Sequence, residues 1–263
     1  GKVMVSDVNG TASWSNAPSV NILQDVDTDT KIQVEESADE DIIRFDLGGT
    51  EQWVMKQPRL EPVNTGKSVL IGRNAGAVDD LTNNANVFVG DGVGALTTTG
   101  ANNVALGERS LGSNISGGGN VALGYLSQYN RTSGQFNISL GSNAMRENVD
   151  GAGNIAIGSG SLRENTNGAQ NVAVGANAGQ NSQGSANVFL GVNSGLNETG
   201  SQKLYIENSN SSSPLIYGEF DNDLVKINGQ LSASEGFTDD DGNTKIQVEE
   251  NVDEDKIRFD IAG

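Results

Sequence analysis

The sequence predicts an all-β protein whose central part is a parallel β-solenoid, or β-roll, and three observations lead to this fold class. A five-residue phrase recurs along the chain: Asn, a β-branched residue, a third residue, a large aliphatic residue and Gly. The phrases that end at Gly107, Gly124, Gly141, Gly158 and Gly175 follow one another every 17 residues. A short constant period is the signature of a solenoid. Finally, no segment shows the 3.6-residue apolar period of an amphipathic helix.

The rest of each repeat is suited to a narrow coil. Three residues after the closing glycine stands a small side chain: Ser110, Ser127, Ala144, Ser161, Ala178 or Ser194. A further glycine stands three residues before the next Asn: Gly100, Gly117, Gly134, Gly151, Gly168 or Gly184. We therefore expect two short extended runs and two glycine corners in each repeat. The repeated Asn is expected to occupy a left-handed corner, to bond local backbone and to form a ladder of stacked amides.

The two faces of each predicted strand carry different side chains. Because side chains alternate along a strand, the β-branched and aliphatic residues share one face and the residue between them points the other way. That middle residue is small, for example Ala105, Ala122, Ala156 or Ala173. A roll this thin buries little surface alone, so we expect a homotrimer with the Ala face near a partner chain. Phe88 and Phe189 take the middle position near the solenoid limits, where we expect them to plug the junctions.

The pattern divides the chain into four segments. Residues 1–66 are expected to form an N-terminal β-hairpin module and a connector, 67–207 the solenoid, 208–230 a β-strand module, and 231–263 the start of a second cassette. An Asn9-Gly10 pair between two β-prone runs predicts the first hairpin. Alternating runs predict strands at 30–35, 43–47, 204–206, 215–220 and 224–227. Residues 50–66 are expected to be the connector.

The last segment repeats the first. Thr30 to Gly49 returns almost unchanged as Thr244 to Gly263. The chain therefore carries one long cassette and the beginning of another. This arrangement predicts a modular fibre built of tandem cassettes.

Composition limits the classes of function. The formal net charge is −18, which would repel nucleic acid and anionic membrane surfaces. The chain has no Cys and no His, so disulfides, thiolate metal sites and His-dependent catalytic triads are excluded. No run of 18 apolar residues is present, so no membrane insertion is expected. The chain begins at Gly1 without a signal-peptide pattern, and we expect a fragment or a processed chain.

The iterated phrase, as in Asn103-Val104-Ala105-Leu106-Gly107, resembles the YadA-like head repeats of trimeric autotransporter adhesins over residues 67–207. The resemblance implies a left-handed parallel β-roll, three chains packed side by side, and an adhesive head. The repeats of that family are usually shorter, and its neck, coiled-coil stalk and membrane barrel have no counterpart here, so its anchoring mechanism is not carried over. The flanks, residues 1–7 and 215–221, resemble segments of Bacteroidetes secreted surface proteins and of phage tail fibres.

Few residues are arranged for chemistry. The carboxylate runs Asp39 to Asp41 and Asp253 to Asp255 could supply the paired carboxyl groups of a glycoside hydrolase, but their acidic, turn-like sequence favours solvated turns. Two oxygen-rich groups have the spacing of a Ca²⁺ loop and are the candidate metal ligands. They are Asp25, Asp27 and Asp29, and Asp239, Asp241 and Asn243. Neither is followed by the Glu of an EF-hand, so a solvated loop is the alternative. No other cofactor is expected.

These observations favour a structural or adhesive segment of an extracellular trimeric fibre, not an enzyme. It would act as a rigid spacer or as an adhesive head that binds a cell-surface glycan or protein receptor. The alternative hypothesis is a phage-type or injection-system tail fibre for host recognition, with glycan-cleaving activity. Either function places the chain outside the cell, on a cell surface or on a virion appendage.

Overall fold

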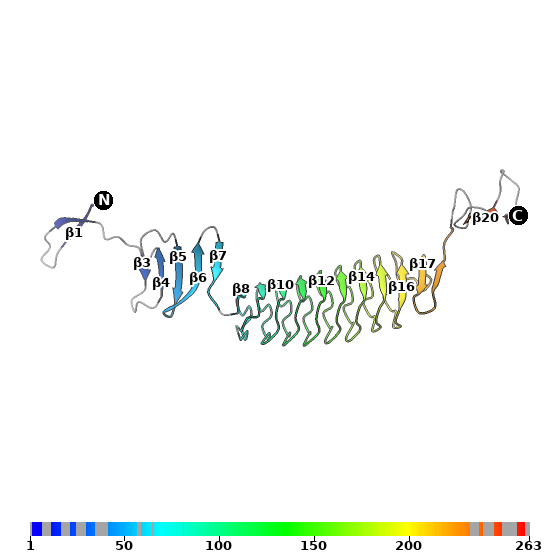
Figure 1. Cartoon of the computed structure of the whole chain (residues 1–263), viewed down its shortest axis with the longest axis horizontal. Helices are drawn as coiled ribbons and strands as arrows, with labels where there is room; N and C mark the ends of the chain where they lie inside the picture. Colours follow the sequence, from blue (N-terminus) through cyan, green and yellow to red (C-terminus); the bar gives the residue numbers. More distant parts are fainter. Residues whose placement is uncertain are drawn as a thin grey trace.

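The computed structural model describes residues 2–6, 12–16, 22–24, 30–34, 42–56, 59–64, 66–80, 82–231, 237–238, 245–248 and 257–260. These residues form 21 β-strands in four sheets, and none of them is helical (Figure 1). The all-β fold class is therefore confirmed. The largest sheet has 11 strands and contains the solenoid.

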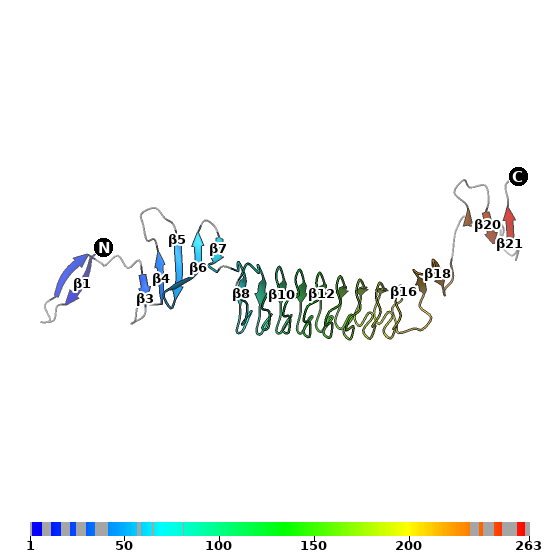
Figure 2. The same cartoon turned by 60° about the horizontal axis from the view of Figure 1, so that its bottom comes forward.

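The solenoid is a stack of parallel three- and four-residue strands in chain order, seen as successive rungs in Figures 1 and 2. The strands are β8 (Val69–Ile71), β9 (Val87–Val89), β10 (Val104–Leu106), β11 (Val121–Leu123), β12 (Ile138–Leu140), β13 (Ile155–Ile157), β14 (Val172–Val174), β15 (Val188–Leu190) and β16 (Lys203–Ile206). Equivalent residues pair directly, so that Val104 lies beside Val121. This register confirms the predicted stacking of one repeat per coil.

Each coil has only one regular strand, whereas the sequence suggested two extended runs. After the strand, the chain turns at the glycine, runs back through a return segment and turns again into the next strand. In the return segment the second and fourth residues after the glycine have positive φ, for example Asn143 (57°) and Met145 (51°). Left-handed residues that alternate with others cannot form an extended strand. The return is therefore a series of turns.

The corner glycine is required by its backbone conformation and by its neighbour. Gly141 has a φ of 140°, a region that only glycine adopts readily. A Cβ atom there would lie 2.6 Å from the carbonyl carbon and oxygen of Gly158 in the next coil. The same close approach recurs up the stack, and it sets how tightly one coil lies on the next.

The repeated Asn forms the expected ladder. Asn154 donates its backbone N–H (2.9 Å) and its side-chain amide (3.0 Å) to Oδ1 of Asn137 in the preceding coil. Its amide also donates to the carbonyl of Gly168, which closes its own coil. The ladder Asn residues are buried, so these bonds satisfy groups that water cannot reach. The left-handed residue is the one before the Asn, not the Asn itself, as at Asn102 and Phe136.

The core of the solenoid lies inside each coil. It is built from the middle residue of the strand and from the fourth residue after the corner glycine. Small and large residues alternate between these two places: Ala105 with Leu111, Ser139 with Met145, Ala156 with Leu162, but Phe88 with Gly94 and Phe189 with Gly195. A Cβ on Gly94 or Gly195 would overlap the phenyl ring opposite it. Each of these coils therefore holds one large side chain.

A polar layer interrupts the apolar core where the coils of β11 and β12 meet. Gln128 donates to Ser139 Oγ (2.8 Å), and Ser139 also bonds Ser127. Arg131 is fully buried and donates to Gln128, to Asn148 and to the carbonyls at 134 and 151. This layer separates two apolar clusters, one around Phe88 and the other around Phe189. Burial lowers the pKa of Arg131 to about 10, so it remains a buried cation at neutral pH.

The flanking sheets are antiparallel. β1 (Lys2–Ser6) pairs with β2 (Ala12–Asn16) as the predicted hairpin. A five-stranded meander follows: β3 (Ile22–Gln24), β4 (Lys31–Val34), β5 (Ile42–Leu47), β6 (Thr50–Lys56) and β7 (Arg59–Pro62). Most of the expected connector is thus part of this sheet. The reason is the turn at residues 48–49, which returns β6 along β5.

The second cassette repeats the pairing of the first. β19 (Phe237–Thr238), β20 (Lys245–Val248) and β21 (Ile257–Asp260) form a three-stranded sheet. Lys245 pairs with Asp260 as Lys31 pairs with Asp46, in the same register. The solenoid itself continues into the antiparallel strands β17 (Ile216–Glu219) and β18 (Leu224–Ile227), both of which the sequence predicted.

Candidate assembly surface

One side of the solenoid is a continuous aliphatic face. The first and third residues of each strand point outward, and from β8 to β15 all of them are Val, Ile or Leu, half-buried or exposed. The aliphatic face is defined by Val69, Ile71, Val87, Val89, Val104, Leu106, Val121, Leu123, Ile138, Leu140, Ile155, Ile157, Val172, Val174, Val188 and Leu190. These sixteen side chains form one contiguous apolar patch of several hundred Å².

The prediction that the Ala face lies near a partner chain is therefore wrong. Ala105, Ala122, Ala156 and Ala173 are completely buried within their own coil. The coil interior is narrow, and a strand that faces Leu or Met from the return segment leaves space for only a small side chain. The large aliphatic residues consequently point outward. Side chains alternate along the strand as predicted, but the small middle residues face the coil interior and the large aliphatic residues face outward.

The rest of the coil surface is mostly polar, with separate exposed apolar residues such as Leu96, Ile115 and Val192. Residues 101–200 carry four arginines against five acidic residues, so most of the negative charge lies in the flanks. On the return side, some of these charges pair locally, as Arg146 does with Glu147 (2.9 Å) and Arg163 with Glu164 (2.8 Å). Such exposed pairs contribute little to stability but keep this side soluble. The aliphatic face thus differs sharply from its surroundings.

The C-terminal end of the solenoid is closed by an aromatic cluster. Phe189, buried as the plug interpretation expects, contacts Tyr205, with 5.9 Å between ring centroids. Tyr205 meets Tyr217 of β17 edge-on at 5.3 Å. Burial and the hydrogen bond to Glu198 raise the pKa of Tyr205, and burial with the bond to Glu219 raises that of Tyr217 to about 12. Both hydroxyl groups therefore stay protonated as donors.

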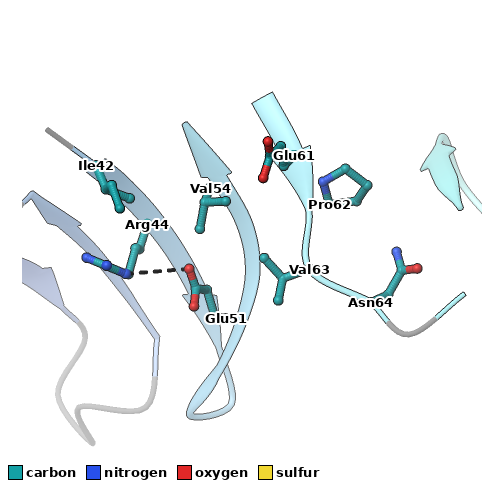
Figure 3. A pocket seen from close by; sticks show the side chains of 8 residues that line it. All are labelled: Ile42, Arg44, Glu51, Val54, Glu61, Pro62, Val63 and Asn64. Atoms are coloured by element: carbon teal, nitrogen blue, oxygen red, sulfur yellow. Dashed lines mark ion pairs between the residues drawn. The ribbon is translucent and has the colours of Figure 1, made fainter. Parts of the chain in front are cut away.

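One cavity lies on the five-stranded sheet, outside the solenoid. It measures about 580 Å³ and is lined by Ile42, Arg44, Glu51, Val54, Glu61, Pro62, Val63 and Asn64 (Figure 3). Glu51 pairs with Arg44 (3.5 Å), and Glu61 pairs with Arg59 (3.3 Å). Glycoside hydrolysis needs one carboxyl group that is protonated, usually in an apolar setting. Here both carboxylates are paired with guanidinium groups, and neither lies in an apolar setting.

A smaller cavity of about 250 Å³ adjoins the C-terminal end of the solenoid. Tyr205, Glu198 and the loop at 210–212 line it. Its principal polar groups bond one another, because Tyr205 donates to Glu198 (2.5 Å) and the second Glu198 oxygen accepts the Gly200 N–H (2.6 Å). This cavity thus lies where the aromatic cluster closes the C-terminal end of the coil stack.

The candidate Ca²⁺ ligands Asp25, Asp27, Asp29, Asp239, Asp241 and Asn243 lie outside the described residues, as do the carboxylate runs 39–41 and 253–255. Within the described ranges, no group of three or more His, Cys, Asp or Glu side chains is placed to hold a metal ion. Nor do those ranges contain a helix long and apolar enough to cross a bilayer. The Ca²⁺ hypothesis stays a prediction.

Comparison with protein-family models, with curated proteins and with solved structures finds no match to this chain. The aliphatic face is therefore interpreted from its own chemistry. Sequence reasoning placed its residues together on one strand face but expected the opposite Ala face to lie near a partner chain, and it missed the polar layer. A signal for the layer was available, since Arg131 occupies the place of Asn114, Asn148 and Asn165 at the 17-residue step.

Proposed function

We propose that the chain is a structural segment of an extracellular homotrimeric fibre, in which three solenoids pack around a common axis through their aliphatic faces. The observation that carries the proposal is the uninterrupted aliphatic face on eight successive strands. Soluble monomers seldom expose an apolar patch of more than a few hundred Å². A standard interface buries about 800 Å² on each partner, and this face is of that order.

A second copy of the chain is the partner that fits this face best. The side chains repeat with the spacing of adjacent strands, about 4.8 Å, along the whole stack. Another solenoid with the same step presents matching ridges and grooves along the entire length. Parallel rods related by an axis along their length form a closed cyclic assembly. Three copies is the number that the resemblance to adhesin head repeats implies.

The proposed role is primarily mechanical. A trimer of solenoids is a stiff rod that holds whatever lies at its two ends at a fixed distance, as a spacer or the shaft of an adhesive head. A receptor, a glycan or a protein on another surface, would be bound by the polar return side, which remains outside. The proposal places the chain on a cell surface or on a virion appendage, and it assigns no catalytic step to it.

The test is the mass in solution. Light scattering of the wild-type chain should give three times the 27.4 kDa of one protomer. The double variant Leu106→Lys/Ile157→Lys places two charges on the aliphatic face and should give the mass of one protomer, because charges cannot be buried there unpaired.

Ile115→Lys is the matched control. Ile115 is 47% exposed and lies at the turn on the return side, away from the aliphatic face. This variant should remain trimeric, and all three proteins should keep the same β-sheet circular dichroism. A monomeric wild-type chain at micromolar concentration would refute the proposal.

A further inference from the structure

Two aromatic side chains of the solenoid are exposed without an evident role in the single chain. Phe136 is 69% exposed and Tyr125 is 47% exposed. The positions equivalent to Phe136 in other coils hold Lys67, Asn102, Gly119, Gly153, Gln170 and other residues, and no other of them is aromatic. The nine coils are otherwise closely similar. The exposed Phe136 and Tyr125 therefore distinguish one level of an otherwise repetitive solenoid.

Phe136 is costly where it stands. Its φ is 56°, a left-handed conformation that costs a side chain with a Cβ about 1 kcal/mol. The ring lies against Gly119 of the preceding coil, where an added Cβ would be 2.8 Å from Cδ1. On the other side stands Gly153, where an added Cβ would meet only Gln170, at 3.8 Å. The Phe136 ring thus projects alone over backbone that carries no side chains at Gly119 and Gly153, and most of the ring surface is exposed to water.

The two rings lie at the same level of the rod but at opposite edges of the aliphatic face. Phe136 precedes β12 and reaches back over Gly119, to the level of the coil that contains β11. Tyr125 follows β11 directly after its corner glycine. In a cyclic assembly, the leading edge of one aliphatic face adjoins the trailing edge of the next. The rotation that joins the copies therefore brings Phe136 of one chain to Tyr125 of its neighbour.

We infer that Phe136 of one copy packs on Tyr125 of the next, and that this contact sets the axial register between the chains. The inference rests on the proposed self-assembly. The aliphatic face cannot set the register well, because a slip by one coil restores nearly all of its contacts. Aromatic pairs, by contrast, gain energy beyond area burial only in a defined geometry. The cost of exposing Phe136 in one chain is then recovered between chains.

Disulfide formation tests the contact, because the chain has no cysteine of its own. In the variant Gln170→Cys/Ser159→Cys, which repeats the positions of Phe136 and Tyr125 two coils further on and leaves both aromatic residues in place, oxidation should link chains into covalent trimers on a non-reducing gel. The two positions of one chain are separated by a strand of about 15 Å, too far for an internal disulfide. The matched variants Gln170→Cys/Ser142→Cys and Gln170→Cys/Ala176→Cys shift the second cysteine by one coil in either direction. They should give at least fivefold less covalent trimer.

A thermodynamic cycle tests the register. Phe136→Ala and Tyr125→Ala should each weaken trimerisation about tenfold, and the double variant should lose little more than either one. Ile115→Ala should be additive with Phe136→Ala. Equal cross-linking at all three cysteine pairs, or additive losses, would overturn the inference while leaving the trimer intact. A wild-type chain that scatters as a monomer would instead remove the proposed function, and this inference with it.

Discussion

At the scale of single residues, the solenoid core is a set of matched volumes. Ala105, Ser139 and Ala156 of the strands are matched by Leu111, Met145 and Leu162 of the return segments, and where the strand contributes Phe, the return segment has Gly. Two coils differ: Ala122 is matched by the polar Gln128, and the space beside Ala173 and Gly179 is filled by Phe189 and Leu162 of the adjacent coils. The return position has positive φ in every coil, including Leu111 (51°) and Leu162 (49°). A leucine there accepts backbone strain in order to fill the coil. Packing thus outweighs local preference at this position.

Exchanging the two volumes at one coil tests this account. Phe88→Ala should lower the free energy of unfolding by roughly 3–5 kcal/mol, because it leaves a cavity in a buried site. Phe88→Ala/Gly94→Leu recreates the pair found at Ala105 and Leu111, and it should recover more than half of that loss. Chemical denaturation of both variants measures the difference.

The control is Gly94→Leu alone. It should be at least as destabilising as Phe88→Ala, because the leucine would overlap the phenyl ring. If the double variant were no more stable than Phe88→Ala, volume matching would not explain the alternation of Phe and Gly. Phe189 is less suited to this test, because its ring also covers Gly179 of the preceding coil.

At the scale of one coil, the polar layer is the exception to an otherwise apolar interior. The four acceptors of Arg131 are neutral: two carbonyls and the side-chain amides of Gln128 and Asn148. A buried charge held this way is costly, and replacing such a group by well-packed neutral residues is often stabilising. The neighbouring coils show which residues would fit.

The triple variant Gln128→Leu/Arg131→Asn/Ser139→Ala gives this layer the residues of the neighbouring coils. It should raise the free energy of unfolding by about 1–3 kcal/mol, because it removes a desolvated cation. Ser127 would keep a partner by donating to its own corner glycine, as Ser161 does to Gly158 (2.8 Å). Thermal and urea unfolding provide the measurement.

Arg131→Ala alone is the informative contrast. It should be destabilising by at least about 2 kcal/mol, since it opens a cavity and leaves the buried side-chain oxygens of Gln128 and Asn148 unpaired. The carbonyls of Gly134 and Gly151 keep the side-chain amides of Asn120 and Asn137 as donors. Should the triple variant prove less stable than the wild type, the polar layer would be a stabilising network and not a tolerated cost.

Element boundaries in the solenoid could be predicted almost to the residue. The phrase Val104-Ala105-Leu106 is strand β10, and its equivalents are strands in every coil. What could not be predicted was which strand face lies inside. Larger apolar residues usually mark the interior, but here the return segment supplies the large interior residue, as Leu111 does in the coil of Ala105, and a three-residue strand pattern does not contain that partner. The outward-facing aliphatic face was missed for the same reason.

At the scale of the whole molecule, the solenoid behaves as a one-dimensional array. Each coil contacts only the coils before and after it through bonds that recur at the same step, as from Val104 to Asn120 and from Val121 to Asn137. In such an array, stability is nearly a sum of coil and interface terms. The number of coils is thus adjustable while the cross-section is fixed.

Deleting residues 154–170 removes one complete 17-residue coil and joins Gly153 to Asn171. The shortened chain should fold, and small-angle scattering should show a rod shorter by about 4.8 Å. Its β-sheet circular dichroism should persist, with a modestly lower Tm. Deleting residues 154–162 instead removes about half a coil and displaces every later corner glycine, so this control should not form a regular stack. Loss of folding after the whole-coil deletion would contradict the array description.

The direction of the hydrogen bonds between coils determines how the rod responds to force. They run from coil to coil along the rod axis, so a pull on its two ends loads all the bonds of one interface together. When an interface ruptures, a 17-residue coil is released and lengthens the tether by about 50 Å. Successive coils then yield one at a time. In the proposed fibre, a particle held by this segment would be tethered stiffly under small loads and would be released gradually under large ones, and the tether would absorb work before it breaks.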